Sequence, residues 1–116
     1  ITVFNKGVMK RDFTYITDVV NGVISILKKN IKSKNLVLNI GKGEPDNLMD
    51  LVNLIQKNYN KKFKIVFSKK IPKGDIRKTF SNTSKAKKII NWNPRINLEE
   101  GIKKFVNWYK IYNGVK

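Results

Sequence analysis

The fold is decided by residues 11–22, which read Arg-Asp-Phe-Thr-Tyr-Ile-Thr-Asp-Val-Val-Asn-Gly. Residues 11–17 are β-prone and partly aromatic, so we predict an extended segment there. Thr17 or Asp18 can then cap a helix by accepting a backbone N–H bond, and this helix is predicted to run to about Lys29. Its apolar residues fall on one helical stripe and are Val19, Val20, Val23, Ile24 and Leu27.

Around this stretch the pattern predicts three strands and a long loop. Residues 1–5 alternate and are β-prone, residues 35–40 have the composition of a buried strand, and residues 63–67 form the third clear strand. The polar residues 68–81 contain proline and glycine and predict a long loop.

Three further helices are predicted from apolar residues at helical spacing, each preceded by capping residues. They cover about residues 47–59, 84–90 and 98–112. The capping residues are Asn47 with Asp50, Thr83 or Asn82, and Asn97 with Glu100. The stripe of the last helix consists of Leu98, Ile102, Phe105, Tyr109 and Tyr112.

Composition excludes several kinds of site. The 116 residues fit a single domain and include neither cysteine nor histidine, so disulfides, thiolate zinc sites and histidine bases are excluded. Only eight acidic residues are present, which disfavours a carboxylate-held metal.

No apolar run approaches the roughly 20 residues of a membrane span. The chain starts at Ile1, without Met, in a segment that reads as the middle of a strand, so we expect a fragment.

The strong basic excess has two interpretations. The 25 basic residues give a net charge of +17, and all but three of them, Arg11, Arg77 and Arg95, are lysines. The lysines are dispersed, so they can simply form a solvated surface. Alternatively, they attract an anionic ligand, either nucleic acid or a phosphorylated small molecule.

Two motifs resemble parts of nicotinamide-cofactor sites but depart from them. In the strand-to-helix loop that starts with Gly41 and Gly43, the third glycine of a G-x-G-x-x-G loop would fall at Asp46, so we predict an ordinary turn. Tyr112 and Lys116 have the spacing of a catalytic Tyr-x-x-x-Lys pair, but Lys116 is the last residue and we attribute the spacing to chance.

Two charged residues are candidates for ligand contact. The planar guanidinium of Arg11 suits a diphosphate, and the alternative is a pair with Asp12 or another carboxylate. Asp75 lies in the loop among Lys73, Arg77 and Lys78, where it could accept from sugar hydroxyls. The alternative for Asp75 is an Asx-type turn at a solvated rim.

Several segments, taken in order, resemble one family. They are residues 1–7, 11–22, 38–45, 48–51, 73–76, 79, 81–86, 92–95, 98–102 and 105–109. Together they look like the C-terminal third of NAD-dependent nucleotide-sugar epimerases/dehydratases, the extended short-chain dehydrogenases. Within that family the chain is most similar to UDP-glucuronate 4-epimerases. The resemblance covers essentially the whole chain.

The resemblance implies an α/β fold for residues 1–116, a small C-terminal substrate-binding lobe with three or four short strands and about four helices. The Rossmann domain is absent. In the parent enzyme an N-terminal Rossmann domain of the same chain holds NAD and the catalytic Tyr-Lys pair. We therefore expect no catalytic residue, no bound NAD and no turnover in this lobe alone. The parent is expected to be a cytoplasmic homodimer without nucleic-acid or membrane partners.

The resemblance also assigns a UDP-sugar site. Arg11 would contact the diphosphate, Asp75 the ribose hydroxyls, and Phe4 and Asn5 the uracil, while Tyr15 would line the same pocket. Asp18 would cap the following helix.

Two departures from the family pattern bear on the substrate. Pro72 stands where many relatives have an arginine, and Ser81-Asn82 replaces a common Ala-Asp. They point to a UDP-uronic acid or UDP-hexose, and hence to UDP-glucuronate or UDP-hexose 4-epimerase. A basic nucleic-acid-binding module is the alternative.

Overall fold

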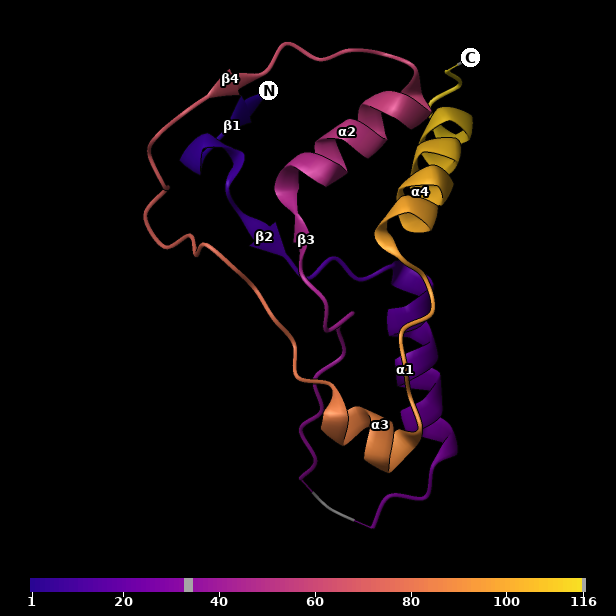
Figure 1. Ribbon diagram of the computed structural model, residues 1–116. Helices are drawn as coiled ribbons and strands as arrows, with labels where there is room; N and C mark the ends of the chain where they lie inside the picture. The colour runs from indigo at the N-terminus through magenta and orange to yellow at the C-terminus, as the bar shows by residue number, and fades with distance from the viewer. Residues whose placement is uncertain (33–34, 116) are drawn as a thin grey trace.

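The computed structural model describes residues 1–32 and 35–115, and these form four two-residue strands and four α-helices (Figure 1). The elements are β1 (Thr2–Val3), the 3₁₀ turn η1 (Asn5–Gly7), β2 (Lys10–Arg11), α1 (Ile16–Lys28), β3 (Asp46–Asn47), α2 (Leu48–Tyr59), β4 (Val66–Phe67), α3 (Ser84–Ile90) and α4 (Leu98–Tyr112). The predicted α/β class is confirmed. Within the described ranges, no helix combines the length and apolar character that a membrane span requires.

The strands form two separate pairs. β1 runs parallel to β4, and β2 runs antiparallel to β3 with Arg11 opposite Asp46. On the other side of β2, the Lys10 amide donates to the Arg77 carbonyl at 3.0 Å, and the Thr79 amide donates to the Lys10 carbonyl at 3.2 Å. The long loop is therefore fixed to β2 by its backbone.

One small core lies where α1 and α3 meet, at the lower end of Figure 1. Ala86, Ile90 and Trp92 are buried, and Leu38 and Ile40 are among the residues that pack against them. Trp92 also joins this core to α1, since its indole Nε1 donates to the Asp18 carbonyl at 2.8 Å.

At the other end of the molecule, α2 and α4 lie side by side (Figure 1). Val52 of α2 and Val106 of α4 are buried, and the rings of Tyr59 and Tyr109 meet edge to face with their centroids 6.1 Å apart. The cap predicted for α4 is confirmed, because the Asn97 Oδ1 accepts from the Glu100 amide at 2.9 Å.

Asp18 is not a helix cap, and that prediction is wrong. α1 begins at Ile16, one turn earlier than expected, so Asp18 lies inside the helix and is only 2% exposed. Its Oδ2 accepts from the backbone amides of Arg95 and Ile96 at 3.0 and 2.9 Å. Asp18 therefore fixes the segment before α4 to α1.

The strand predicted at residues 35–40 is not formed. Within the described ranges this segment pairs with no other strand, although Leu38 and Ile40 still pack on the core. The other predicted strands shrink to β1 and β4. The chain leaves β1 quickly because Asn5 and Lys6 have positive φ values of 49° and 51°.

β2 and β3 were not predicted as strands. Each is only two residues long, so neither carries the alternation by which a strand is recognised. The antiparallel pair therefore has no local sequence signal, and it joins residues that are 35 and 37 positions apart in the chain.

Most of the predicted stripe of α1 faces solvent, and Val19 alone among its five residues is half-buried. Val20, Val23, Ile24 and Leu27 are 46, 51, 39 and 80% exposed, while the buried face carries Asp18 and Gly22. The molecule is also thin, measuring 52 × 36 × 18 Å with a radius of gyration of 17.0 Å. A compact chain of this length has a radius of gyration of about 13 Å. The described residues therefore leave the apolar face of α1 uncovered.

Replacing Asp18 by Ala is expected to destabilise the chain by about 3 kcal/mol, because the buried amides of Arg95 and Ile96 lose their acceptor. Urea unfolding followed by tryptophan fluorescence measures this, since Trp92 lies in the same core. Asp50→Ala is the matched control because that carboxylate contacts only the exposed Asn47 side chain. Equal stability of the two variants would contradict the role assigned to Asp18.

Candidate functional site

The candidate site is built around an ion pair between Arg11 on β2 and Asp75 in the long loop. The Arg11 Nη2 lies 2.5 Å from the Asp75 Oδ1, and the two side chains are 22% and 34% exposed. Both residues were singled out in the sequence as ligand contacts, and the fold brings them together across 64 residues of sequence. The anticipated pairing of Arg11 with a carboxylate is formed, with Asp75 and not with Asp12.

Backbone groups engage one further nitrogen of Arg11 and the same oxygen of Asp75. The Arg11 Nη1 donates to the carbonyls of Lys10 at 2.9 Å and Arg77 at 3.4 Å. The Asp75 Oδ1 also accepts from the Ile76 amide at 2.8 Å, and the Asp75 amide donates to the Pro72 carbonyl at 3.0 Å. A backbone turn therefore runs from Pro72 to Asp75, whereas the Asx-type turn given as the alternative would need a bond from the Arg77 amide to the Asp75 side chain, which is not among the hydrogen bonds of the described residues.

The electrostatic surroundings of the pair are strongly positive. Between Asp50 and Glu99 the sequence holds 13 lysines and arginines, and Asp75 is the only acidic residue. Lys73, Arg77 and Lys78 flank it in the loop. A site with this charge favours an anionic ligand.

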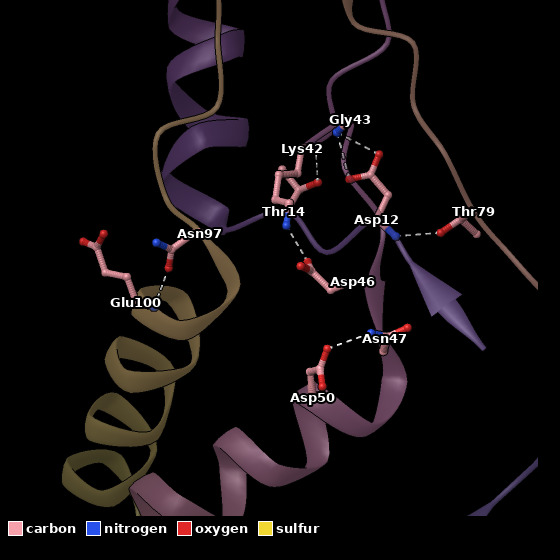
Figure 2. Close-up of polar contacts among 10 residues, drawn as sticks. All are labelled: Asp12, Thr14, Lys42, Gly43, Asp46, Asn47, Asp50, Thr79, Asn97 and Glu100. Carbon is pink, nitrogen blue, oxygen red and sulfur yellow. Dashed lines mark hydrogen bonds and ion pairs between the residues drawn. The ribbon is translucent and has the colours of Figure 1, made fainter. Parts of the chain in front are cut away.

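Asp12, next to Arg11, holds the site together (Figure 2). Its carboxylate accepts from the Gly43 amide at 3.0 Å and from the Ser81 amide at 2.9 Å. Its own amide donates to the Thr79 hydroxyl at 2.8 Å. Three segments far apart in sequence are thereby joined beside Arg11. From the sequence, Asp12 was only an alternative partner of Arg11, and its role in joining these segments was missed.

The loop at Gly41–Gly43 does not fit the phosphates of a dinucleotide. In a dinucleotide site the loop amides point at the pyrophosphate. Here the Lys42 amide donates to the Thr14 hydroxyl at 3.0 Å, and the Gly43 amide donates to Asp12 (Figure 2). Gly41 is needed for close packing, because a Cβ there would lie 2.5 Å from the Ser81 Cβ. This loop is therefore a structural turn that offers NAD no cradle.

Phe4 and Asn5 lie at the start of the long loop. The Asn5 amide donates to the Lys70 carbonyl at 3.1 Å, and the next amide, of Lys6, donates to the Ser68 carbonyl at 2.9 Å. Phe4 is 37% exposed. The structure thus places Asn5 against the beginning of the loop that carries Asp75, five residues before that carboxylate.

Tyr15 lies elsewhere, at the start of α1 against α4. A Cβ at Gly101 would come within 3.2 Å of the Tyr15 ring. Tyr15 lines an apolar cavity of about 260 Å³ that also borders Leu51, Ile102 and Phe105 but neither Arg11 nor Asp75. The structure therefore does not bring Tyr15 together with the ion pair.

The Tyr112 and Lys116 spacing falls partly outside the described residues, because Lys116 is not among them. Tyr112 is 75% exposed at the end of α4, where its ring stacks on Trp108 at 5.3 Å. Residues 1–32 and 35–115 also contain no cluster of three acidic side chains that could hold a metal.

Comparison with known families and proteins gives consistent matches. A family model described as GDP-mannose 4,6 dehydratase matches residues 2–105. The chain is 40% identical over 109 residues to an uncharacterized protein of Methanocaldococcus jannaschii, covering 94% of this chain and 32% of that protein. It is 37% identical over 111 residues to a UDP-glucuronate 4-epimerase of Thermodesulfobacterium geofontis, covering 95% of this chain and 33% of that protein.

Solved structures agree with the sequence matches. The UDP-glucuronic acid 4-epimerase of Bacillus cereus, in complex with UDP-glucuronic acid and NAD, matches with a TM-score of 0.84 and 29% identity over 96% of this chain and 35% of its own. The UDP-glucose 4-epimerase of Thermotoga maritima with UDP-glucose matches with a TM-score of 0.84 and 30% identity, over 97% of this chain and 35% of its own. The chain therefore spans about a third of the length of the relatives it matches.

Replacing Asp12 by Ala is expected to speed hydrogen exchange of the Gly43 and Ser81 amides roughly tenfold or more, because each loses a bond to a charged acceptor. Exchange followed by NMR or mass spectrometry measures the change. Asp46→Ala is the control, since Asp46 pairs with the Lys42 side chain in the same loop. Unchanged protection in the Asp12 variant would refute the joining role.

Proposed function

The chain belongs to the GDP-mannose 4,6 dehydratase family, and on this premise we propose that it is the UDP-sugar-binding part of an NAD-dependent epimerase/dehydratase. The observation that carries the proposal is the Arg11–Asp75 pair within a strongly basic loop. UDP-glucuronate or a UDP-hexose is the proposed substrate, and 4-epimerisation the proposed reaction of the whole enzyme. A cytoplasmic homodimer is the form that the resemblance implies.

The chemistry of UDP fits the two charged groups. Arg11 can donate parallel bonds to diphosphate oxygens, and Asp75 can accept from the ribose hydroxyls. In UDP the diphosphate is attached to the ribose, so one ligand can reach two residues that already touch each other. We place the uracil along Phe4 and Asn5, at the start of the same loop. Tyr15 as a pocket residue stays a prediction.

NAD, when bound by the remainder of the enzyme, would supply hydride transfer at the sugar. We propose that Arg11 and Asp75 of this chain bind and orient the nucleotide. The Lys42 and Gly43 amides already donate to Thr14 and Asp12, so their loop is not a phosphate cradle. We therefore propose that the catalytic groups lie in the two thirds of the relatives that this chain does not match.

A cofactor-binding α/β domain is the proposed partner for the exposed face of α1. That face is apolar from Ile16 to Leu27, which are 62% and 80% exposed. Val37, in the segment that has a strand-like sequence but no paired strand among the described residues, is 78% exposed. Apolar side chains of this number on one face are usually covered by protein.

The nucleic-acid alternative lacks a supporting feature. Nucleic-acid sites rely on arginine for bidentate contacts, and here one of the three arginines is already paired with a carboxylate. The relatives named by activity act on nucleotide sugars. A nucleotide sugar is therefore the ligand we favour.

Replacing Arg11 by Ala is expected to weaken UDP binding roughly tenfold or more, since a charge-assisted contact to the diphosphate is lost. Isothermal titration of the whole gene product measures this. Arg95→Ala is the matched control, because Arg95 is exposed and contacts α1 through its backbone amide. Absence of UDP binding by the wild type, together with single-stranded RNA binding that falls steeply with salt, would overturn the proposal in favour of the alternative.

Replacing Val23 and Leu27 together by Lys is expected to lower binding of a hydrophobic dye such as ANS by the separately expressed 116-residue chain, since the exposed apolar face of α1 is interrupted. In the whole gene product the same change should lower the melting temperature, because the two lysine charges would then lie on a face that another domain covers. Val8→Lys with Ile76→Lys is the control, as these residues are 73% and 55% exposed away from α1. An unchanged melting temperature would argue against a covered α1 face.

A further inference from the structure

We propose that α2 and α4, at the end of the molecule where both helices finish, form a peripheral docking surface for an anionic lipid bilayer. The aromatic face of α4 enters the headgroup region, and the lysines around it contact the lipid phosphates. This surface is independent of the proposed function, since it uses residues outside the Arg11–Asp75 site. It departs from the absence of a membrane partner that the family resemblance implies.

Half of the 12 aromatic side chains gather where α2 and α4 end side by side (Figure 1). They are Tyr59, Phe63, Phe105, Trp108, Tyr109 and Tyr112. Along α4 the rings of Phe105, Trp108 and Tyr112 follow one another, with centroids 5.7 and 5.3 Å apart. These three side chains are 46, 53 and 75% exposed, so the described residues leave an aromatic face of α4 uncovered.

The chemistry of this face differs from that of the exposed face of α1. The α1 face is aliphatic, with Val23 and Leu27 among its members, and suits the interior of a protein. The α4 face carries the indole of Trp108 and the phenol of Tyr112. Each of these side chains has an apolar body and a polar tip, and both residue types gather where a bilayer meets water. The α4 face therefore suits the headgroup region of a membrane.

The surroundings of the aromatic face are positively charged. Residues 51–67 and 101–115 contain seven lysines and no acidic residue. Those lysines are Lys57, Lys61, Lys62, Lys64, Lys103, Lys104 and Lys110. Two of them pair at 3.3 Å with the glutamates in the first turn of α4, whereas Lys61, Lys62 and Lys103 are exposed. A lysine cluster beside an amphipathic helix with aromatic residues is complementary to anionic lipids.

A single-stranded nucleic acid is also an anion that binds aromatic residues, but the arrangement of the rings favours lipid. Nucleic-acid bases stack on the faces of aromatic side chains. The rings of Trp108 and Tyr112 already stack on each other, with 22° between their planes, so one face of each ring is covered. Ile111 in the same turn is 74% exposed and offers no ring for stacking. An aliphatic side chain next to stacked rings fits an acyl boundary better than a base.

The test is flotation of the whole gene product with vesicles of equal parts phosphatidylcholine and phosphatidylglycerol, compared with vesicles of phosphatidylcholine alone. The wild type should float with the anionic vesicles only, and less so at high salt, because salt screens the lysine charges. Trp108→Ala should weaken this binding about tenfold, because the indole no longer enters the headgroup region. Phe80→Ala is the matched control, since that ring is 63% exposed beside Lys78 but lies outside the aromatic cluster.

The charge contribution is tested in the same way. Lys61→Gln with Lys62→Gln should weaken binding to the anionic vesicles about tenfold, because two charges near the headgroups are removed. Lys87→Gln with Lys88→Gln is the control, as this exposed lysine pair lies on α3 at the other end of the molecule (Figure 1). Melting curves confirm that each variant is folded.

Three results would overturn the docking surface. The first is a wild type that floats with neither kind of vesicle or equally with both, and the second is flotation that Trp108→Ala leaves unchanged. The third is single-stranded RNA binding that Trp108→Ala abolishes, without any vesicle binding, which would favour a nucleic acid. UDP titration of Trp108→Ala should match the wild type, so failure of the docking surface leaves the proposed function untouched.

Discussion

The Asp12 carboxylate, which accepts the backbone amides of Gly43 and Ser81, is the contact on which the candidate site depends. It joins the segment that carries Arg11 to two segments that are 31 and 69 residues away. Strands of two residues contribute few ladder bonds, so they cannot hold these segments by themselves. A carboxylate has several acceptor positions and can hold such segments together, because each hydrogen bond to a charged acceptor stabilises the fold more than a bond to a neutral acceptor.

The Asp18 carboxylate also joins distant segments, because it accepts hydrogen bonds from two backbone amides in the segment that precedes α4. The chain has only eight acidic residues, and three of them, Asp12, Asp18 and Asp75, accept hydrogen bonds from backbone amides, while Asp75 also binds Arg11. Most of the basic residues, by contrast, lie on exposed positions. The acids are therefore the informative charges in this protein, whereas the lysine excess describes mainly its surface.

Sequence reasoning succeeded where the signal is local. The helices α2, α3 and α4 follow from apolar spacing, and the cap predicted at Asn97 is formed. The caps predicted for α2 and α3, at Asn47 and Thr83, make no side-chain cap bond. It failed where the signal is non-local: the two-residue strands carry no alternation, and Asp18 resembles a cap until the start of α1 is known. Arg11 and Asp75 were singled out as candidates from their residue types and neighbours, and the resemblance assigned their ligand contacts, but the sequence could not reveal that two residues 64 positions apart touch.

The two largest mismatches between pattern and structure occur in neighbouring elements and have one physical explanation. The stripe of α1 has the periodicity of a buried face yet is exposed, and residues 35–40 have the composition of a buried strand yet pair with nothing in the described ranges. These two segments are in contact, since a Cβ at Gly22 would lie 3.1 Å from Ile40. Both patterns are those of segments that become buried and paired only when another domain covers them. The mismatch therefore marks the surface at which we propose that the cofactor domain joins this chain.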